Sequence, residues 1–276
     1  MTFSYQRVYR GPVRAALLDW AGTTMDFGCM APAVVFQKVF ERAGVPITME
    51  EARAPMGAHK RVHIQKITQL EPVRTRWTAA HGTPPTEADV DRMFADFVPL
   101  QLDCLSDYST MIPGALEVVA ALRSRGIKIG STTGYLRDMM EINLRDAKTQ
   151  GYEPDSTVCA SDVPAGRPYP YMCLQNVINL QVWPVEACVK VDDTVPGVEE
   201  GLNSGMWTIG LAVSGNEVGL SLADWKALPV AEQETRRRRA YERMTMAGAH
   251  YVVDTIAEML PCFNDVEARL ARGEKP

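Results

Sequence analysis

The sequence predicts an α/β protein built on a doubly wound parallel sheet, with an all-helical domain inserted after the first strand. Two observations predict this fold. Short apolar runs alternate with amphipathic stretches, which is typical of a parallel sheet covered by helices on both faces. A segment of about a hundred residues after the first apolar run carries helical patterns throughout.

Six apolar runs that end in polar residues are the predicted strands. The first run, VRAALLDW, stops at Asp19. The stretch 114–126 has helical spacing of apolar residues, and Gly126 is its stop signal. The other predicted strands lie, in chain order, within 127–134, 156–162, 187–193, 206–213 and, with a weaker pattern, 249–255.

Polar residues stand at the ends of three of these runs. Ligands of such sheets bind at the carboxyl ends of the strands, so we expect these side chains to face one crevice. They are Asp19, the pair Thr132 and Thr133, and the pair Asp192 and Asp193.

The segment between the first two predicted strands favours helices. Residues 48–54 open with the capping box Thr48-x-x-Glu51. An all-helical insert here is most simply a cap domain over the crevice, and ordinary crossover helices packed on the sheet are the alternative. The other helical stretches are 31–44, 55–70 and 86–105. We expect an α/β core domain of residues 1–28 and 108–276 and a helical cap domain of residues 29–107.

Composition narrows the class of protein. The net charge of -5 over 276 residues argues against a dedicated nucleic-acid surface, and the run Arg236–Arg239 has acidic flanks typical of a solvated helix face, with a nucleic-acid patch as the minor alternative. No apolar run approaches the roughly 20 residues of a spanning helix, and the first residues lack the apolar core of a signal peptide. Six scattered cysteines without a Cys-x-x-Cys pair indicate reduced thiols. We expect a cytoplasmic protein without membrane or nucleic-acid partners.

The polar strand ends suggest phosphoryl chemistry. A carboxylate such as Asp19 can attack phosphorus and hold Mg²⁺ through its second oxygen, although a helix cap would explain it equally well. Thr133 offers a hydroxyl and a backbone N–H to a phosphoryl oxygen, or it caps a helix. Arg167 stands between turn residues that could aim it at phosphate, or it is a surface arginine. Asp192 and Asp193 could complete a Mg²⁺ site, and a turn would explain one of the two.

This order of residues resembles the haloacid dehalogenase superfamily of phosphotransferases. In members that cleave phosphate esters, a second aspartate two residues after the first protonates the leaving oxygen. Here that position is Ala21. A carbon leaving group gains nothing from such an acid and needs an electron sink, and an imine formed from a lysine and an aldehyde is one.

Lys60 is the best candidate for that lysine. Pro55 and Gly57 break the chain just before it, so Lys60 should lie in the first turn of a helix, where the helix dipole and burial both favour its neutral form. Imine formation requires a large decrease of the lysine pKa, because at a pKa of about 10.4 only about one lysine in a few thousand is neutral at pH 7. His63 lies three residues on and could relay a proton. The alternatives are that Lys60 is a solvated helix lysine, or that Lys38 or Lys66 is the amine.

Four segments together are similar to the phosphonoacetaldehyde hydrolases, a branch of that superfamily: DWAGTTMDFGCMAP, EARAPMGAHKRVH, IKIGSTTGY and VPAGRPYPYMC. The resemblance implies hydrolysis of the P–C bond of a small phosphonate, with Asp19 as nucleophile and Lys60 as the imine-forming amine. It also implies a homodimer joined through the caps. The implied Mg²⁺ ligands are Asp19, the backbone carbonyl of Ala21 and Asp193; the implied phosphate ligands are Thr133, Gly134 and Arg167; the other implied substrate contacts are Cys29, Met56, His63 and Tyr135.

Two positions depart from that family. Many relatives read V-G-D-T where this chain has Asp192 in place of the glycine, and many carry a further aspartate at the position of Gly197. Asp192 could replace that carboxylate near the metal. The competing functions are a phosphate-monoester phosphatase or phosphomutase of the same fold, disfavoured by Ala21, and a non-catalytic phosphonate-binding protein.

Overall fold

The computed structural model describes residues 8–276, so residues 1–7 of the expected core range lie outside the described part. Its centre is a six-stranded sheet in the order β3-β2-β1-β4-β5-β6, and all neighbouring strands pair in parallel. All six predicted strands are confirmed. They are β1 Ala15–Leu18, β2 Lys128–Thr133, β3 Ser156–Cys159, β4 Cys188–Asp192, β5 Trp207–Leu211 and β6 Tyr251–Val253.

Strand β1 lies between β2 and β4, and its register fixes where the site forms. Leu18 is opposite Ser131 of β2 on one side and opposite Val191 of β4 on the other. The three strands therefore end at nearly the same level. Their polar ends meet at one edge of the sheet, as the sequence predicts.

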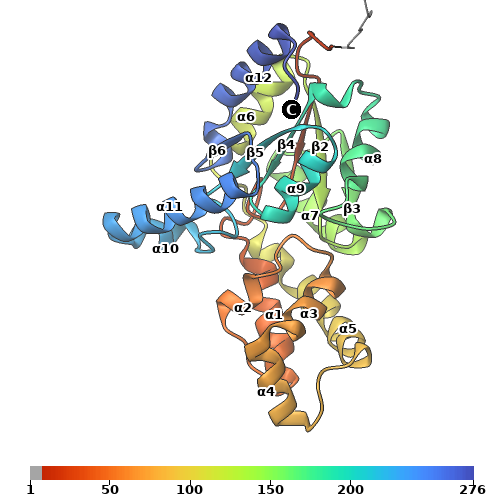
Figure 1. Ribbon diagram of the computed structural model, residues 1–276, viewed down its shortest axis with the longest axis vertical. Helices are drawn as coiled ribbons and strands as arrows, with labels where there is room; N and C mark the ends of the chain where they lie inside the picture. Colours follow the sequence, from red (N-terminus) through yellow and green to blue (C-terminus); the bar gives the residue numbers. More distant parts are fainter. Residues whose placement is uncertain (1–7) are drawn as a thin grey trace, which may run out of the picture.

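Helices cover both faces of the sheet, which confirms the doubly wound arrangement (Figure 1). Because successive side chains of a strand point to opposite faces, β1 divides its contacts. Ala16 and Leu18 belong to the large apolar cluster that contains residues of α6 and α12, and Ala15 and Leu17 belong to a cluster with α8. The core helices are α6 Ala115–Ser124, α7 Arg137–Thr149, α8 Tyr171–Leu180, α9 Val195–Asn203, α10 Leu222–Ala227, α11 Val230–Met246 and α12 Leu260–Arg272, with short 3₁₀ helices η2 Ala160–Asp162, η3 Val185–Ala187 and η4 Ile256–Glu258.

The segment between β1 and α6 is helical and stands apart from the sheet at the lower end of Figure 1. We call it the helical insert. Phe36 of α1 and Phe97 of α5 stack with ring centroids 4.6 Å apart, so the insert has apolar packing of its own. Its elements are α1 Met30–Arg42, α2 Met49–Arg53, α3 Lys60–Gln69, α4 Glu71–His81, α5 Glu87–Cys104 and η1 Leu105–Tyr108. The domain limits at 28/29 and 107/108 stay a prediction.

Local signals in the sequence act as expected. Glu51 N–H donates to Thr48 Oγ1 at 3.1 Å and Thr48 N–H donates to Glu51 Oε2 at 2.8 Å, which is the predicted capping box. Arg236 and Arg237 lie on α11 in ion pairs with nearby acids, as expected of a solvated helix face. Among residues 8–276, no helix combines the length and apolar character that crossing a membrane would require.

Candidate active site

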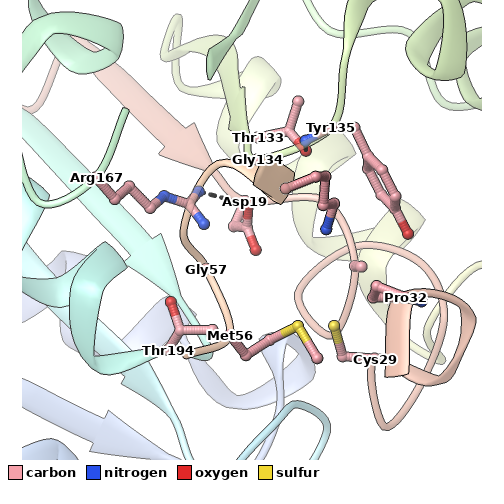
Figure 2. A pocket seen from close by; sticks show the side chains of 12 residues that line it. Asp19, Cys29, Pro32, Met56, Gly57, Thr133, Gly134, Tyr135, Arg167 and Thr194 are labelled. Carbon is pink, nitrogen blue, oxygen red and sulfur yellow. Dashed lines mark hydrogen bonds and ion pairs between the residues drawn. The ribbon is translucent and has the colours of Figure 1, made fainter. Parts of the chain in front are cut away.

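A small pocket lies where the helical insert meets the carboxyl edge of the sheet (Figure 2). Its volume of about 20 Å³ has room for about one water molecule, so a larger ligand fits only when lining residues move. The lining residues are Asp19, Ala21, Cys29, Pro32, Met56, Gly57, Lys60, Thr133, Gly134, Tyr135, Arg167 and Thr194. Nine of these twelve are among the residues that the sequence singles out for the site.

Asp19 is fixed by the sheet. Its backbone N–H donates to Val191 O at 3.0 Å, which extends the ladder between β1 and β4 by one residue. The side chain is buried, and Asp19 Oδ1 accepts a hydrogen bond from Arg167 Nη2 at 2.5 Å (Figure 2). The carboxylate is therefore held at the floor of the pocket by a charged partner.

Lys60 enters the pocket from the insert. It is the first residue of α3, and only 5% of its surface is exposed. Its Nζ lies 4.6 Å from the ring centroid of Tyr135 and 5.8 Å from that of Phe36. Burial lowers the pKa of Lys60 from 10.5 to about 8; Cys29, Asp19 and Asp26 oppose this shift, and the charge of Arg167 adds to it.

The three candidate lysines therefore differ in kind. Lys38 on α1 and Lys66 on α3 are exposed, whereas Lys60 is buried against two aromatic rings. The alternative of a solvated helix lysine is wrong for Lys60. Desolvation favours the neutral amine only where water is excluded, so Lys60 alone of the three is in an environment that promotes nucleophilic chemistry.

Two glycines let the insert approach the core closely. A Cβ at Gly134 would lie 3.1 Å from the carbonyl oxygen of Ala58. Gly57 has φ +90°, and a Cβ there would lie 2.6 Å from Thr194 Oγ1. These contacts bring the backbone before α3 against the ends of β2 and β4, which places Lys60 in the same pocket as Asp19.

The phosphate candidates lie at the end of β2 and in the loop after β3. Thr133 is buried, and its Oγ1 accepts from the N–H of Tyr135 at 3.2 Å. Arg167 is also buried, and in Figure 2 its guanidinium points at Asp19. Burial lowers the pKa of Arg167, but the carboxylates of Asp19, Asp192 and Glu200 outweigh it and hold that pKa well above its ordinary value.

Three buried carboxylates could hold a metal ion. Oxygens of Asp19, Asp192 and Asp193 lie within 4.8 Å of one another. Asp193 Oδ1 accepts from Thr23 Oγ1 at 3.2 Å, and its Oδ2 accepts from the N–H of Asn216 at 2.8 Å. Burial raises the pKa of Asp193 well above its ordinary value, and the charges of Asp19 and Asp192 raise it further. Such crowding of buried carboxylates fits a hard divalent cation, because the cation would relieve the repulsion.

His63 does not line the pocket, unlike the other predicted substrate contacts. Its ring stacks on Phe36 at 3.8 Å, and Nε2 lies 2.8 Å from Ala52 O. A carbonyl only accepts, so Nε2 carries the proton and Nδ1 is free of one. Burial lowers the pKa of His63 well below its usual range, and Lys60 lowers it further, so the ring is a neutral support behind Lys60.

Three buried polar residues lie behind Arg167. The sequence pattern marks Thr132 only as a strand end, and it does not predict a place at the site for Lys190 or Glu200. Lys190 has a signal in hindsight, because a lysine that interrupts the apolar run of β4 two residues before Asp192 must share a face with it. Glu200 has none, since it follows another glutamate on α9.

The chain is similar to known proteins over its whole length. The family profile described as haloacid dehalogenase-like hydrolase matches residues 13–205. A curated protein of Hahella chejuensis, named phosphonoacetaldehyde hydrolase, is 49% identical over 276 residues, which is 100% of this chain and 94% of that relative. One of Klebsiella pneumoniae with the same name is 49% identical over 266 residues, 96% of this chain and 99% of the relative. The crystal structure of a protein from Oleispira antarctica described as phosphonoacetaldehyde hydrolase-like superposes with a TM-score of 0.97 at 46% identity and covers 100% of both chains.

Proposed function

The chain belongs to the phosphonoacetaldehyde hydrolases, within the haloacid dehalogenase-like hydrolases, and we propose that it hydrolyses the P–C bond of phosphonoacetaldehyde to acetaldehyde and phosphate through a lysine imine and an aspartyl phosphate. The observation that carries this proposal is the pairing of Lys60 with Asp19. A buried amine whose pKa falls to about 8 lines the same pocket as a carboxylate at the end of β1.

Lys60 acts on the aldehyde. Its neutral amine attacks the carbonyl carbon, the carbonyl oxygen takes up a proton from solvent and leaves as water, and a protonated imine remains on Nζ. With a pKa of about 8, roughly one amine in ten is neutral at pH 7, which is several hundred times more than for an ordinary lysine. The aromatic rings of Tyr135 and Phe36 face Nζ and help to exclude bulk water from the imine.

Asp19 acts on the phosphonate. One carboxylate oxygen attacks phosphorus, and as the P–C bond breaks its electron pair moves into the imine to give a neutral enamine. The enamine takes a proton at carbon, and water then releases acetaldehyde and the free amine of Lys60. A second water cleaves the aspartyl phosphate, which returns Asp19 and gives phosphate.

Arg167 and the residues at the end of β2 stabilise the negative charge on the phosphoryl oxygens. Arg167 is buried and fully charged, so its N–H groups interact strongly with an anion that enters the pocket. Thr133 and Gly134 are part of the wall, and their backbone N–H groups can donate to the same oxygens.

Mg²⁺ fits the carboxylate cluster, and Asp19, Asp193 and the carbonyl of Ala21 are the residues that would hold it. When bound, Mg²⁺ supplies Lewis-acid neutralisation of the charge shared by the phosphonate and Asp19. Ala21 puts no carboxyl group at the pocket wall two residues after Asp19, which suits a carbon leaving group and disfavours the phosphatase and phosphomutase alternatives.

The proposal is tested by turnover with both products measured. With phosphonoacetaldehyde and Mg²⁺ we expect acetaldehyde and phosphate in equal amounts, and at most about a thousandth of that rate with simple phosphate esters. Lys60→Arg should abolish acetaldehyde formation, because a guanidinium forms no imine under these conditions. Ester hydrolysis as fast as P–C cleavage would favour the phosphatase, and binding of the phosphonate without products would favour a binding protein.

The resemblance also predicts a homodimer joined through the helical insert. Sedimentation velocity at micromolar concentration distinguishes a mass near 61 kDa, twice that of the 30.5 kDa chain, from that of the monomer.

A further inference from the structure

A buried ionic group behind the pocket takes no part in the reaction proposed above. It consists of Lys190 on β4, Asp192 at the end of the same strand, and Glu200 on α9, all fully inaccessible to solvent. Burying charged groups destabilises a fold unless each is paired. Such a cluster therefore needs either tight internal pairing or a functional reason.

The common partner of the group is Arg167. Its Nε lies 3.1 Å from Glu200 Oε2, and its Nη2 lies 3.0 Å from Asp192 Oδ2 and 2.5 Å from Asp19 Oδ1. Lys190 Nζ lies 2.8 Å from Asp192 Oδ2 and 3.5 Å from Glu200 Oε2. Among residues 8–276, the hydrogen bonds of the Arg167 guanidinium come from Nε and Nη2 and none comes from Nη1. The guanidinium is therefore held on one side and can donate from Nη1 to an anion in the pocket that it lines.

The surroundings of Asp192 disfavour a metal ion at either carboxylate oxygen. Its Oδ1 accepts from both the N–H of Thr194 at 3.0 Å and Thr194 Oγ1 at 2.7 Å, and its Oδ2 faces the two cations Arg167 and Lys190. A divalent cation at Oδ2 would be repelled by the ammonium 2.8 Å away. The hydrogen-bond donors to Asp193 are neutral groups, so Asp193 suits the metal and Asp192 does not.

The side chain of Asp192 also explains why residue 197 is glycine. A Cβ at Gly197 would lie 1.9 Å from Asp192 Cγ and 2.1 Å from each of its carboxylate oxygens. A side chain at 197 and the observed side chain at 192 therefore exclude each other. The two departures from the family pattern therefore concern one shared space, which the side chain of Asp192 fills in this chain.

We propose that Asp192, Lys190 and Glu200 are positioning residues that hold the guanidinium of Arg167 for the phosphoryl group, and that Asp192 is not a metal ligand. The proposal rests on the proposed function only for the anion that Arg167 receives. Lys190 balances the carboxylate that this chain adds at 192, and Thr132 Oγ1 joins the group by accepting from Lys190 Nζ at 2.6 Å and from Arg167 Nη2 at 3.0 Å.

The first test compares two binding constants in the full-length protein by titration calorimetry. Asp192→Asn should weaken binding of inorganic phosphate, measured at saturating Mg²⁺, about tenfold or more, and should change the Mg²⁺ dissociation constant by less than about threefold. A tenfold loss of Mg²⁺ affinity with phosphate affinity unchanged would make Asp192 a metal ligand and overturn the proposal. Phosphate binding needs no turnover, so this result is independent of whether the chain cleaves a P–C bond.

Two matched variants on α9 test the same proposal if Asp192→Asn does not fold. Glu200→Gln should also weaken phosphate binding, whereas Glu199→Gln, at the neighbouring and less buried position, should not. If the two variants bind phosphate equally well, Glu200 does not position Arg167.

The second test addresses the shared space at 192 and 197. Gly197→Asp alone should lower the melting temperature sharply, and the double variant Asp192→Gly with Gly197→Asp should recover most of the loss. A Gly197→Asp protein as stable as the wild type, or a double variant no more stable than Gly197→Asp, would contradict the exclusion.

Discussion

Replacing Lys60 with methionine should make the protein more stable at neutral pH. The pKa of this buried amine falls from 10.5 to about 8 on folding, mainly because burial disfavours its charged form. At about 1.36 kcal/mol per pKa unit, holding the charged amine destabilises the fold by about 3 kcal/mol. Methionine has a similar shape and no charge, so this penalty disappears, and packing in the pocket adds a contribution that does not depend on pH.

The pH dependence of the excess stability of Lys60→Met shows whether the depressed pKa of Lys60 causes it. The folded-state pKa is below the unfolded value, so the unfolded chain binds more protons and the penalty is fully present below about pH 8. It is lost as the pH rises from about 8 towards 10.5. The excess stability of Lys60→Met over the wild type should therefore be about 2 kcal/mol smaller at pH 9.5 than at pH 7.

Urea unfolding of both proteins at the two pH values, in buffer with EDTA, measures this difference. Other groups titrate equally in the two proteins and cancel. Lys66→Met is the matched control, because Lys66 lies on the same helix and is exposed, and it should show no such pH dependence. A Lys60→Met excess that is the same at both pH values, or a variant less stable than the wild type at pH 7, would refute the depressed pKa.

Three further outcomes are expected. The value of kcat/KM should rise with pH and level off above about 8, as Lys60 loses its proton, and a flat profile from pH 6.5 to 9 would exclude a free amine of that pKa. Gly57→Ala should lower both kcat/KM and the melting temperature, because its Cβ would lie 2.6 Å from Thr194 Oγ1. Gly44→Ala is the control for backbone strain, since Gly44 also has a positive φ but a Cβ there would have nothing within 4 Å. Equal effects of the two substitutions would contradict the role of the contact with Thr194. Asp193→Asn should weaken Mg²⁺ binding about tenfold or more in calorimetry, and unchanged affinity would move the metal elsewhere.

The sheet and the helical insert could be predicted because their signals are local. Strands buried on both faces give continuous apolar runs, and helix starts such as Thr48-x-x-Glu51 are encoded within four residues. The pocket could be predicted because neighbouring parallel strands end at the same edge of the sheet. Asp19 and Thr133 stand at the ends of two such strands, so they lie close together whatever the conformation of the loops.

The sequence alone could not predict which residues of a helix contact the site, because that depends on how the helix is rotated against its neighbours. Glu199 and Glu200 are indistinguishable in the sequence, and only the packing of α9 on β4 and β5 buries the second of them against Arg167. His63 shares a face of α3 with Lys60, as its spacing predicts, but its ring stacks on Phe36 in the insert and does not line the pocket. The spacing of residues in the sequence predicts which side chains share one face of a helix, but it does not predict what that face packs against.

Trapping the imine tests the proposed chemistry most directly. The protein is treated with borohydride in the presence and absence of phosphonoacetaldehyde, digested, and mapped by mass spectrometry, with Lys60→Arg as the control. We predict a reduced two-carbon adduct on Lys60 that appears only with substrate and is absent from the variant. An adduct confined to Lys38 or Lys66, or full acetaldehyde production by Lys60→Arg, would show that the buried amine of α3 is not the electron sink.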